Sequence, residues 1–330
     1  MAKQPMKKET ELRYDLLTDD WVVVAPGRAK RFREKNPLGV CPFCEIESQR
    51  EPALVYSNGV KKDSEDLKNW TTVVIPNKYP VCNPYQNPKK EKENEFRLKI
   101  KSPGFHELVI TRDHSKPMAL LPLGKIKEVF DCYKDRLTEY KKYDFVKQVV
   151  VFHNHGSDAA ASQPHPHSQI LTMPLIDKEF EIILNNSEKY FKKNKKCLQC
   201  EIINLEKKNK ERIVFENKDF IAYCPFAPKF LFEVIITPKK HNPDFTEIKD
   251  SEKQSLAEAF KHILLKLYKK LDNPSYNFYL HTAPYGKKYP HFHYYWKIFP
   301  RLSPLAGFEL GANMEILTML PEDQAKFLRK

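Results

Sequence analysis

The chain has 330 residues, of which 30% are charged and 41% hydrophobic, and its formal net charge at pH 7 is +13. This composition is typical of a soluble globular protein, and the length suffices for two domains or one large domain. No apolar run approaches about 18 residues, which excludes a membrane-spanning helix. The polar, lysine-containing start of the chain lacks an apolar segment, so we expect no secretory signal there.

The positive charge is spread along the chain. Lysine pairs recur at Lys61-Lys62, Lys89-Lys90, Lys141-Lys142, Lys192-Lys193, Lys195-Lys196 and Lys207-Lys208. A dispersed pattern is typical of a solvated surface and favours small anionic substrates by electrostatic steering. Nucleic-acid binding surfaces instead concentrate basic residues with aromatic residues among them. We therefore expect neither nucleic acid nor a membrane as a partner.

The cysteines indicate a reducing compartment. Four of the seven form two Cys-x-x-Cys pairs, and the other three stand alone at Cys82, Cys132 and Cys224. An odd number that includes two such pairs is typical of a cytoplasmic protein that binds metal, and not of a disulfide framework. We expect the three lone cysteines to be small buried apolar residues.

The expected elements of the first half are strands at 21–25, 71–75, 106–111 and 148–152 and a helix over 126–140. The first strand is followed by Arg28 and Arg31, whose guanidinium groups could bind phosphate in a bidentate manner. The second strand leads to Asn77 and the last to Asn154. The sequence from 86 to 98 is expected to be a charged loop.

Two histidines that flank one proline form the most informative segment, at residues 161–170. His165, His167 and Gln169 are two residues apart, so on a strand all three project from one face. Pro164 and Pro166 exclude a helix interior. A proline-fixed start of a strand suits an imidazole that must hold one position, as a nucleophile or a metal ligand does. A solvated loop is the alternative for this pair of histidines.

The second half repeats the first. Residues 197–202 resemble 41–46, and 233–237 followed by His241 resemble 107–111 followed by His114. His114 and His165 are 51 residues apart, and His241 and His293 are 52 apart. This duplication predicts an α+β protein of two fused domains, residues 1–190 and 191–330, each an antiparallel sheet with flanking helices.

Each copy offers two cysteines, a histidine after a strand and a histidine from the last His-bearing segment. Two thiolates and two imidazoles are the expected tetrahedral ligands of structural zinc. The predicted sets are Cys41, Cys44, His114 and His165, and Cys197, Cys200, His241 and His293, with His291 in reserve for the last place. A redox pair beside ordinary histidines is the alternative.

If His165 is a ligand, His167 is left for chemistry. A positioned neutral imidazole can attack phosphorus and form a phosphoramidate, and Gln169 can donate a hydrogen bond to a phosphoryl oxygen. In the second copy Tyr295 takes the place of the nucleophile and Lys297 that of the glutamine. That copy is expected to keep structure without chemistry.

The chain resembles the galactose-1-phosphate uridylyltransferase family of the histidine-triad superfamily over nearly its whole length. The resemblance depends chiefly on residues 162–169, with support from residues 13–15, Trp21, 26–31, 77–80, 113–115 and 307–309. It implies two histidine-triad-like domains and a ping-pong reaction. In that reaction His167 takes UMP from UDP-glucose and passes it to a hexose 1-phosphate such as galactose 1-phosphate.

The resemblance also implies further roles. Gln169 and Ser162 would contact the phosphoryl group, Glu309 a sugar hydroxyl, and the nucleotide or diphosphate contacts would be Arg28, Arg31, Asn77 and Asn154. The family also implies a homodimer. Ala160 departs from the glycine of the well-known bacterial enzymes, and Tyr295 and Lys297 occupy positions where those enzymes bind a second metal.

Other functions remain open at this stage. The chain's ending, residues 300–311, is closer to the branch with two zinc sites, in which some members act on ADP-glucose with phosphate as acceptor. An ADP-glucose phosphorylase of the same fold is therefore the main alternative. A zinc-stabilised nucleotide-binding protein without turnover is another, and a redox protein a weaker one.

Overall fold

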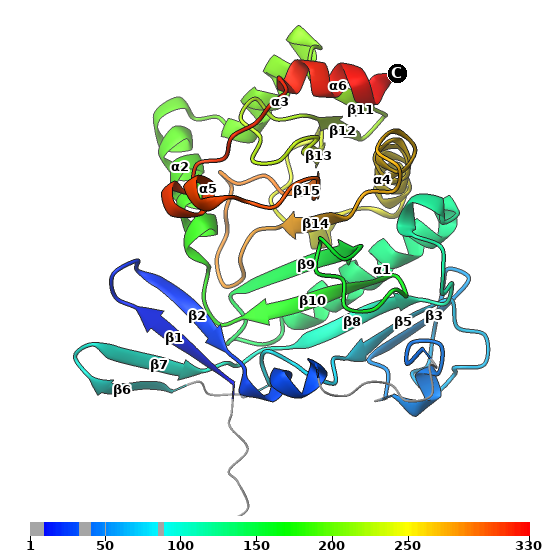
Figure 1. The fold of residues 1–330 in the computed structure, drawn as a ribbon, viewed down its shortest axis with the longest axis vertical. Helices are drawn as coiled ribbons and strands as arrows, with labels where there is room; N and C mark the ends of the chain where they lie inside the picture. Colours follow the sequence, from blue (N-terminus) through cyan, green and yellow to red (C-terminus); the bar gives the residue numbers. More distant parts are fainter. Residues whose placement is uncertain (1–9, 33–40, 50, 85–88) are drawn as a thin grey trace, which may run out of the picture.

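The computed structural model describes residues 10–32, 41–49, 51–84 and 89–330. Within them an 11-stranded sheet runs through the whole molecule in the order β11-β12-β13-β15-β14-β9-β10-β8-β5-β3-β4 (Figure 1). Its strands are β3 (Leu54–Ser57), β4 (Val60–Lys62), β5 (Thr72–Pro76), β8 (His106–Thr111), β9 (Gln148–His155), β10 (His167–Met173), β11 (Ile213–Glu216), β12 (Phe220–Tyr223), β13 (Val234–Pro238), β14 (Tyr276–His281) and β15 (Tyr295–Pro300). The ladders between these strands are antiparallel.

The remaining elements surround this sheet. A separate sheet of order β2-β1-β7-β6 contains β1 (Glu11–Asp15), β2 (Asp20–Val24), β6 (Lys90–Asn94) and β7 (Arg97–Lys101). The helices are α1 (Leu123–Tyr140), α2 (Lys178–Asn194), α3 (Leu198–Asn209), α4 (Asp250–Lys270), α5 (Gly307–Ala312) and α6 (Pro321–Arg329), and the 3-10 helices are η1 (Pro26–Phe32), η2 (Ile46–Ser48), η3 (Met118–Leu120) and η4 (Phe245–Glu247). Helices α1 and α4 pack against each other, α1 on β5 and β8 and α4 on β12 and β13.

The two halves of the large sheet have the same internal order. From the centre outward, β9-β10-β8-β5-β3 in the first half corresponds to β14-β15-β13-β12-β11 in the second. The predicted duplication and the antiparallel α+β class are therefore confirmed. The two predicted sheets are not separate in the structure, because β9 pairs with β14 and joins them into one sheet. The division at residue 190 stays a prediction.

The core is continuous across this junction. Phe278 of β14 is fully buried, and its ring lies 5.3 Å from that of Phe260 in α4 and 5.9 Å from that of Trp296 in β15. Phe130 of α1 lies 4.9 Å from Phe260 and 5.6 Å from Trp296, measured between ring centroids. Edge-to-face and tilted aromatic contacts add to the free energy of burial. The two helices and the two half-sheets thus share one aromatic centre.

The prediction of a charged loop at residues 86–98 is wrong for most of residues 89–98, which are the part of that range that the structure describes. Strands β6 and β7 form an antiparallel hairpin there, although the residues of β6 are all exposed. Lys99 of β7 lies 2.8 Å from Glu93 and 3.7 Å from Glu91. Opposite charges on neighbouring strands stabilise the pairing. The apolar alternation by which strands are recognised is present in β7, at Leu98 and Ile100, but absent from β6. No helix in the described part of the chain is both long and apolar enough to cross a bilayer.

Replacing Phe278 with Ala removes a buried ring at the junction and is expected to lower the free energy of unfolding by about 3–5 kcal/mol. Phe96 is 68% exposed in the β6–β7 turn, so Phe96→Ala is the matched control, with a change below about 0.5 kcal/mol. Urea denaturation followed by tryptophan fluorescence measures both. Equal effects of the two substitutions would show that the junction is not part of the core.

Candidate active site and metal centres

Strand β10 has two different faces. Ser168 points to the helical side, because its Oγ accepts a 2.5 Å hydrogen bond from the hydroxyl of Tyr133 in α1. Neighbouring residues on a strand point to opposite sides, so His167 and Gln169 face away from α1, as their spacing predicts. Asn154 faces the same way, one position beyond His153, which pairs with Ser168. The face of β9 and β10 that is turned away from α1, called the open face below, thus brings together the predicted site residues His167, Gln169 and Asn154.

The hydrogen bonds of His167 assign its tautomer. Nδ1 lies 3.0 Å from the backbone oxygen of His165, which can only accept, so Nδ1 carries the hydrogen. The lone pair of the neutral ring is then on Nε2. The ring is 7% exposed, and Phe43 packs edge-on against it with the centroids 5.0 Å apart. A buried imidazole held from two sides, with Nε2 basic, has the form that a nucleophile requires.

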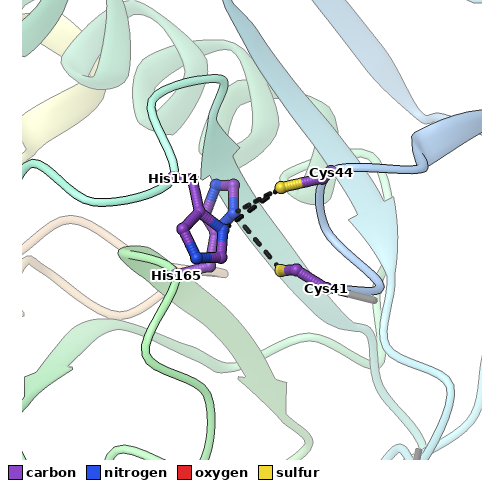
Figure 2. A group of neighbouring side chains, drawn as sticks. All are labelled: Cys41, Cys44, His114 and His165. Carbon is purple, nitrogen blue, oxygen red and sulfur yellow. Dashed lines mark hydrogen bonds between the residues drawn. The ribbon is translucent and has the colours of Figure 1, made fainter. Parts of the chain in front are cut away.

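The first predicted metal set is brought together in the structure (Figure 2). Cys41 and Cys44 lie in a turn closed by a 3.0 Å backbone hydrogen bond between them. The Sγ of Cys44 lies 3.2 Å from Nδ1 of His114 and 3.6 Å from Nδ1 of His165, and the Sγ of Cys41 lies 3.5 Å from Nδ1 of His165. Nε2 of His165 donates to the oxygen of Thr111 at 2.7 Å. That bond leaves Nδ1 with its lone pair turned to the thiols, as metal-binding histidines require.

The second set repeats this arrangement. The Sγ of Cys200 lies 3.5 Å from Nδ1 of His241 and 3.4 Å from Nδ1 of His293. Nε2 of His293 donates to the oxygen of Pro238 at 2.9 Å, and Cys197 completes a group whose ligand atoms lie within 4.8 Å of one another. His293, and not the reserve His291, therefore takes the fourth position. Both groups could hold a metal ion.

The protonation of the second pair of thiols also suits a cation. A hydrogen bond from Cys200 lowers the pKa of Cys197 well below its usual value, with further help from His241 and His293. The same hydrogen bond raises the pKa of Cys200, and burial adds to it. One thiol of the pair is therefore easier to deprotonate than an ordinary cysteine, and the other is harder. A metal ion that binds there would favour the deprotonated form of both, because thiolates are the ligating form.

Two loops approach the open face beside Gln169. The side chain of Asn77 accepts a hydrogen bond from the nitrogen of Tyr79 at 2.9 Å, and Nη1 of Arg28 donates to the oxygen of Tyr79 at 2.7 Å. Nδ2 of Asn77 lies 3.2 Å from Nε2 of His106, and the same Nε2 lies 2.9 Å from Oε1 of Gln169. Arg28 and Asn77 are therefore joined through the backbone of Tyr79, and Asn77 lies against the ring of His106, which contacts Gln169.

For Arg31, Ser162 and Glu309 the structure gives no contact with the other predicted site residues that it describes. The backbone of Arg31 lies in η1, but its side chain is outside the described part of the chain. Ser162 is exposed in the segment before β10. Glu309 lies in α5, and no contact connects it to His167; its Oε2 is buried without a hydrogen-bond partner among the described residues.

The matching place in the second half is filled by its own side chains. Tyr295 and Lys297 stand where His167 and Gln169 stand, as predicted. The hydroxyl of Tyr295 is hydrogen-bonded to Nδ1 of His281 at 2.8 Å, and Nζ of Lys297 lies 3.1 Å from Glu233. Burial lowers the pKa of His281 to about 3 and raises that of Tyr295 well above its usual value. The pair of Tyr295 and His281 and the ion pair of Lys297 and Glu233 thus occupy the place that corresponds to the site of the first half.

Comparison with known proteins places both halves of the chain in one family. The family described as "Galactose-1-phosphate uridyl transferase, N-terminal domain" matches residues 2–177, and its C-terminal counterpart matches residues 183–328. An ADP-glucose phosphorylase of Arabidopsis thaliana is 32% identical, over 97% of this chain and 92% of its own. A galactose-1-phosphate uridylyltransferase of Thermotoga maritima is 31% identical, over 97% and 98%.

Solved structures agree with these sequence relatives. A structure described as that of uridylyltransferase has a TM-score of 0.82 at 30% identity, over 97% of each chain. The structure of an ADP-glucose phosphorylase from Arabidopsis thaliana with bound ADP-glucose has a TM-score of 0.76 at 30% identity, over 98% of this chain and 99% of its own. The fold of this chain is therefore similar to proteins of both names.

The loop before the two histidines contains a strained residue that offers a test. Ala160 has a φ of 59°, in the left-handed region that favours glycine. Ala160→Gly is expected to raise the free energy of unfolding by about 0.5–1 kcal/mol, because relief of the strain exceeds the entropy cost of glycine. The neighbouring Ala161→Gly relieves no such strain, and we expect it to lower stability by about 0.5–1 kcal/mol. Thermal or urea unfolding distinguishes the two, and a loss for both variants would contradict the assigned backbone.

Proposed function

The chain belongs to the galactose-1-phosphate uridylyltransferase family, and we propose that it transfers a nucleotidyl group through a covalent intermediate on His167. The leading reaction moves UMP from UDP-glucose to a hexose 1-phosphate such as galactose 1-phosphate. The observation that carries this proposal is the buried ring of His167, whose Nδ1 donates to the oxygen of His165 and whose Nε2 holds the lone pair.

The reaction proceeds in two displacements. In the first, Nε2 of His167 attacks the α-phosphorus, a P–N bond forms, and the P–O bond to the sugar phosphate breaks with its electron pair going to the leaving oxygen. The ring becomes cationic, and its Nδ1–H bond to the oxygen of His165 becomes charge-assisted and stronger. In the second, a phosphate oxygen of the acceptor attacks the same phosphorus and the P–N bond breaks.

The residues around His167 suit the phosphoryl group. We propose that Gln169 and Ser162 contact its oxygens, and that Arg28, Arg31, Asn77 and Asn154 contact the nucleotide or diphosphate. For Glu309, a buried carboxylate oxygen without a partner among the described residues supports a contact to a sugar hydroxyl. We also propose a homodimer, supported by apolar side chains exposed near the C-terminus at Leu302, Phe308, Leu310, Met314, Ile316 and Leu320.

Zinc is the metal that the two Cys/His groups fit best. With bond lengths of about 2.3 Å to sulfur and 2.0 Å to nitrogen, a tetrahedral zinc ion separates S and N ligands by about 3.5 Å. The S–N distances in the two groups range from 3.2 Å at His114 to 3.6 Å at His165. Zinc in the first group would hold His165, whose backbone oxygen orients His167.

A second candidate is the phosphorolysis of ADP-glucose. It is favoured by the 32% identity with the Arabidopsis ADP-glucose phosphorylase over 97% of this chain. The covalent step on His167 would be the same, with AMP in place of UMP and inorganic phosphate as acceptor. A cytoplasmic location stays a prediction from the two Cys-x-x-Cys pairs.

The purified protein is expected to hold about two zinc ions per chain, one for each complete ligand set. Cys44→Ala and Cys200→Ala should each lower the content to about one, because three ligands hold the ion more weakly. Cys224→Ala removes a buried cysteine outside both groups and is the matched control. Elemental analysis by mass spectrometry measures the ion, and a protein with no metal and four titratable thiols in these groups would indicate the redox alternative.

Mixing the protein with UDP-glucose and no acceptor is expected to add the mass of one UMP to the intact protein. The adduct should be absent in His167→Ala and lost when galactose 1-phosphate is added. It should be present in His262→Ala, the matched control, because His262 lies in α4 with its ring against Phe215. An AMP adduct from ADP-glucose that inorganic phosphate removes would assign the second candidate. No adduct from either nucleotide sugar would contradict the covalent mechanism.

A further inference from the structure

Gln169 and Asn154 flank His167 on the open face, and each has an amide group with two chemically opposite ends. Only the N–H end can donate to a phosphoryl oxygen, whereas the C=O end would repel it. Which end faces the phosphate is decided by the partner of the other end. In this chain both partners are side chains that sequence reasoning did not single out, His106 and Asn277.

The orientation of Gln169 begins at a backbone nitrogen. The N–H of Val81 donates to Nδ1 of His106 at 3.2 Å, so Nδ1 must hold a lone pair and the ring is neutral with its hydrogen on Nε2. That Nε2 then donates to Oε1 of Gln169 at 2.9 Å. Because the carbonyl end is held by His106, the N–H end of Gln169 is the one turned away from β8. His106 is 6% exposed, so solvent does not compete for this bond.

The orientation of Asn154 begins at a backbone oxygen. Nδ2 of Asn277 donates to the oxygen of Ala159 at 3.1 Å, which fixes which end of the Asn277 amide carries nitrogen. The same Nδ2 donates its second hydrogen to Oδ1 of Asn154 at 2.8 Å. The carbonyl end of Asn154 is therefore also held by the protein. Asn277 lies on β14 of the second half, opposite Asn154 on β9.

The second half supports this interpretation by contrast. His165 and His293 donate to Thr111 and Pro238, which end β8 and β13, and five residues before these lie His106 and Glu233. The strand register therefore aligns Glu233 with His106, one residue from the alignment that the sequence suggests. The contact of His106 with Gln169 thus corresponds to the ion pair of Glu233 with Lys297. The same position carries a hydrogen-bond donor in the half with the nucleophile and an acceptor in the half without it.

We propose that His106 and Asn277 are positioning residues that fix the amides of Gln169 and Asn154 with their N–H ends toward the phosphoryl group that His167 attacks. The proposal rests on the proposed nucleotidyl transfer and adds to it the source of the donors' orientation. Neither residue has to touch substrate. His106 is oriented by the backbone nitrogen of Val81 and in turn orients the amide of Gln169. Asn277 is oriented by the backbone oxygen of Ala159 and in turn orients the amide of Asn154.

The test is a double-mutant cycle on the rate of adduct formation at saturating nucleotide sugar. Gln169→Ala is expected to slow this step about 100-fold, as loss of one preorganised donor does. His106→Leu should slow it by about tenfold or more, with a smaller change in KM. In the Gln169→Ala background His106→Leu should add less than about twofold, because its effect passes through Gln169. His106→Gln restores a donor near the position of Nε2 and should recover most of the loss, and His262→Leu is the matched control.

Asn277→Ala and Asn154→Ala form the corresponding second cycle, with the same expected lack of additivity. Independent, multiplying losses in both cycles would overturn the proposal, since His106 and Asn277 would then act by another route. A wild-type protein without adduct would overturn the proposed function instead. In that case ¹⁵N NMR of the histidine rings still decides, because His106 must be the Nε2–H tautomer; an Nδ1–H ring would overturn the orientation of Gln169 whatever the reaction.

Discussion

The double pairing of β10 is the constraint on which the site depends. This strand is hydrogen-bonded to β9 on one side and to β8 on the other, and the two registers agree. Because side chains alternate along a strand, a slip of one residue would turn His167 to the helices and Ser168 to the open face. The bond from Tyr133 to Ser168 opposes that slip from the helical side. The direction of the His167 side chain is therefore set by the backbone before any substrate is present.

One scaffold occurs twice in the chain with opposite outcomes. Both halves place a histidine that donates to the end of a neighbouring strand and a Cys/His group beside it. In the first half the next position on the strand face carries His167, and amide side chains surround it. In the second, His281, Tyr295, Lys297 and Glu233 satisfy one another. The sheet, the helices and the Cys/His groups occur in both halves, and only the first half has a histidine in the place that Tyr295 takes in the second.

The sequence predicted what is encoded locally or by repetition. Cys41, Cys44 and their counterparts were predictable because thiol and imidazole types recur in the same order, and His167 because two prolines mark its segment. His106 and Asn277 were not, since an isolated histidine or asparagine in a strand has no local signature. Their roles depend on the register of β8 with β10 and of β9 with β14. The β6–β7 hairpin was missed because β6 has no apolar residue, and charge pairs with Lys99 of β7 stabilise its pairing.

Phe43 gives the first Cys/His group an influence beyond structure. It lies between Cys41 and Cys44 in sequence, and its ring packs against both His165 and His167. Any cation that orders the turn of the two thiols also orders the ring that holds the nucleophile in place. Thermodynamic coupling between two sites is reciprocal, so a nucleotide that favoured the ordered position of His167 would in turn strengthen the binding of that cation. Binding of the cation and binding of the nucleotide would then be linked equilibria.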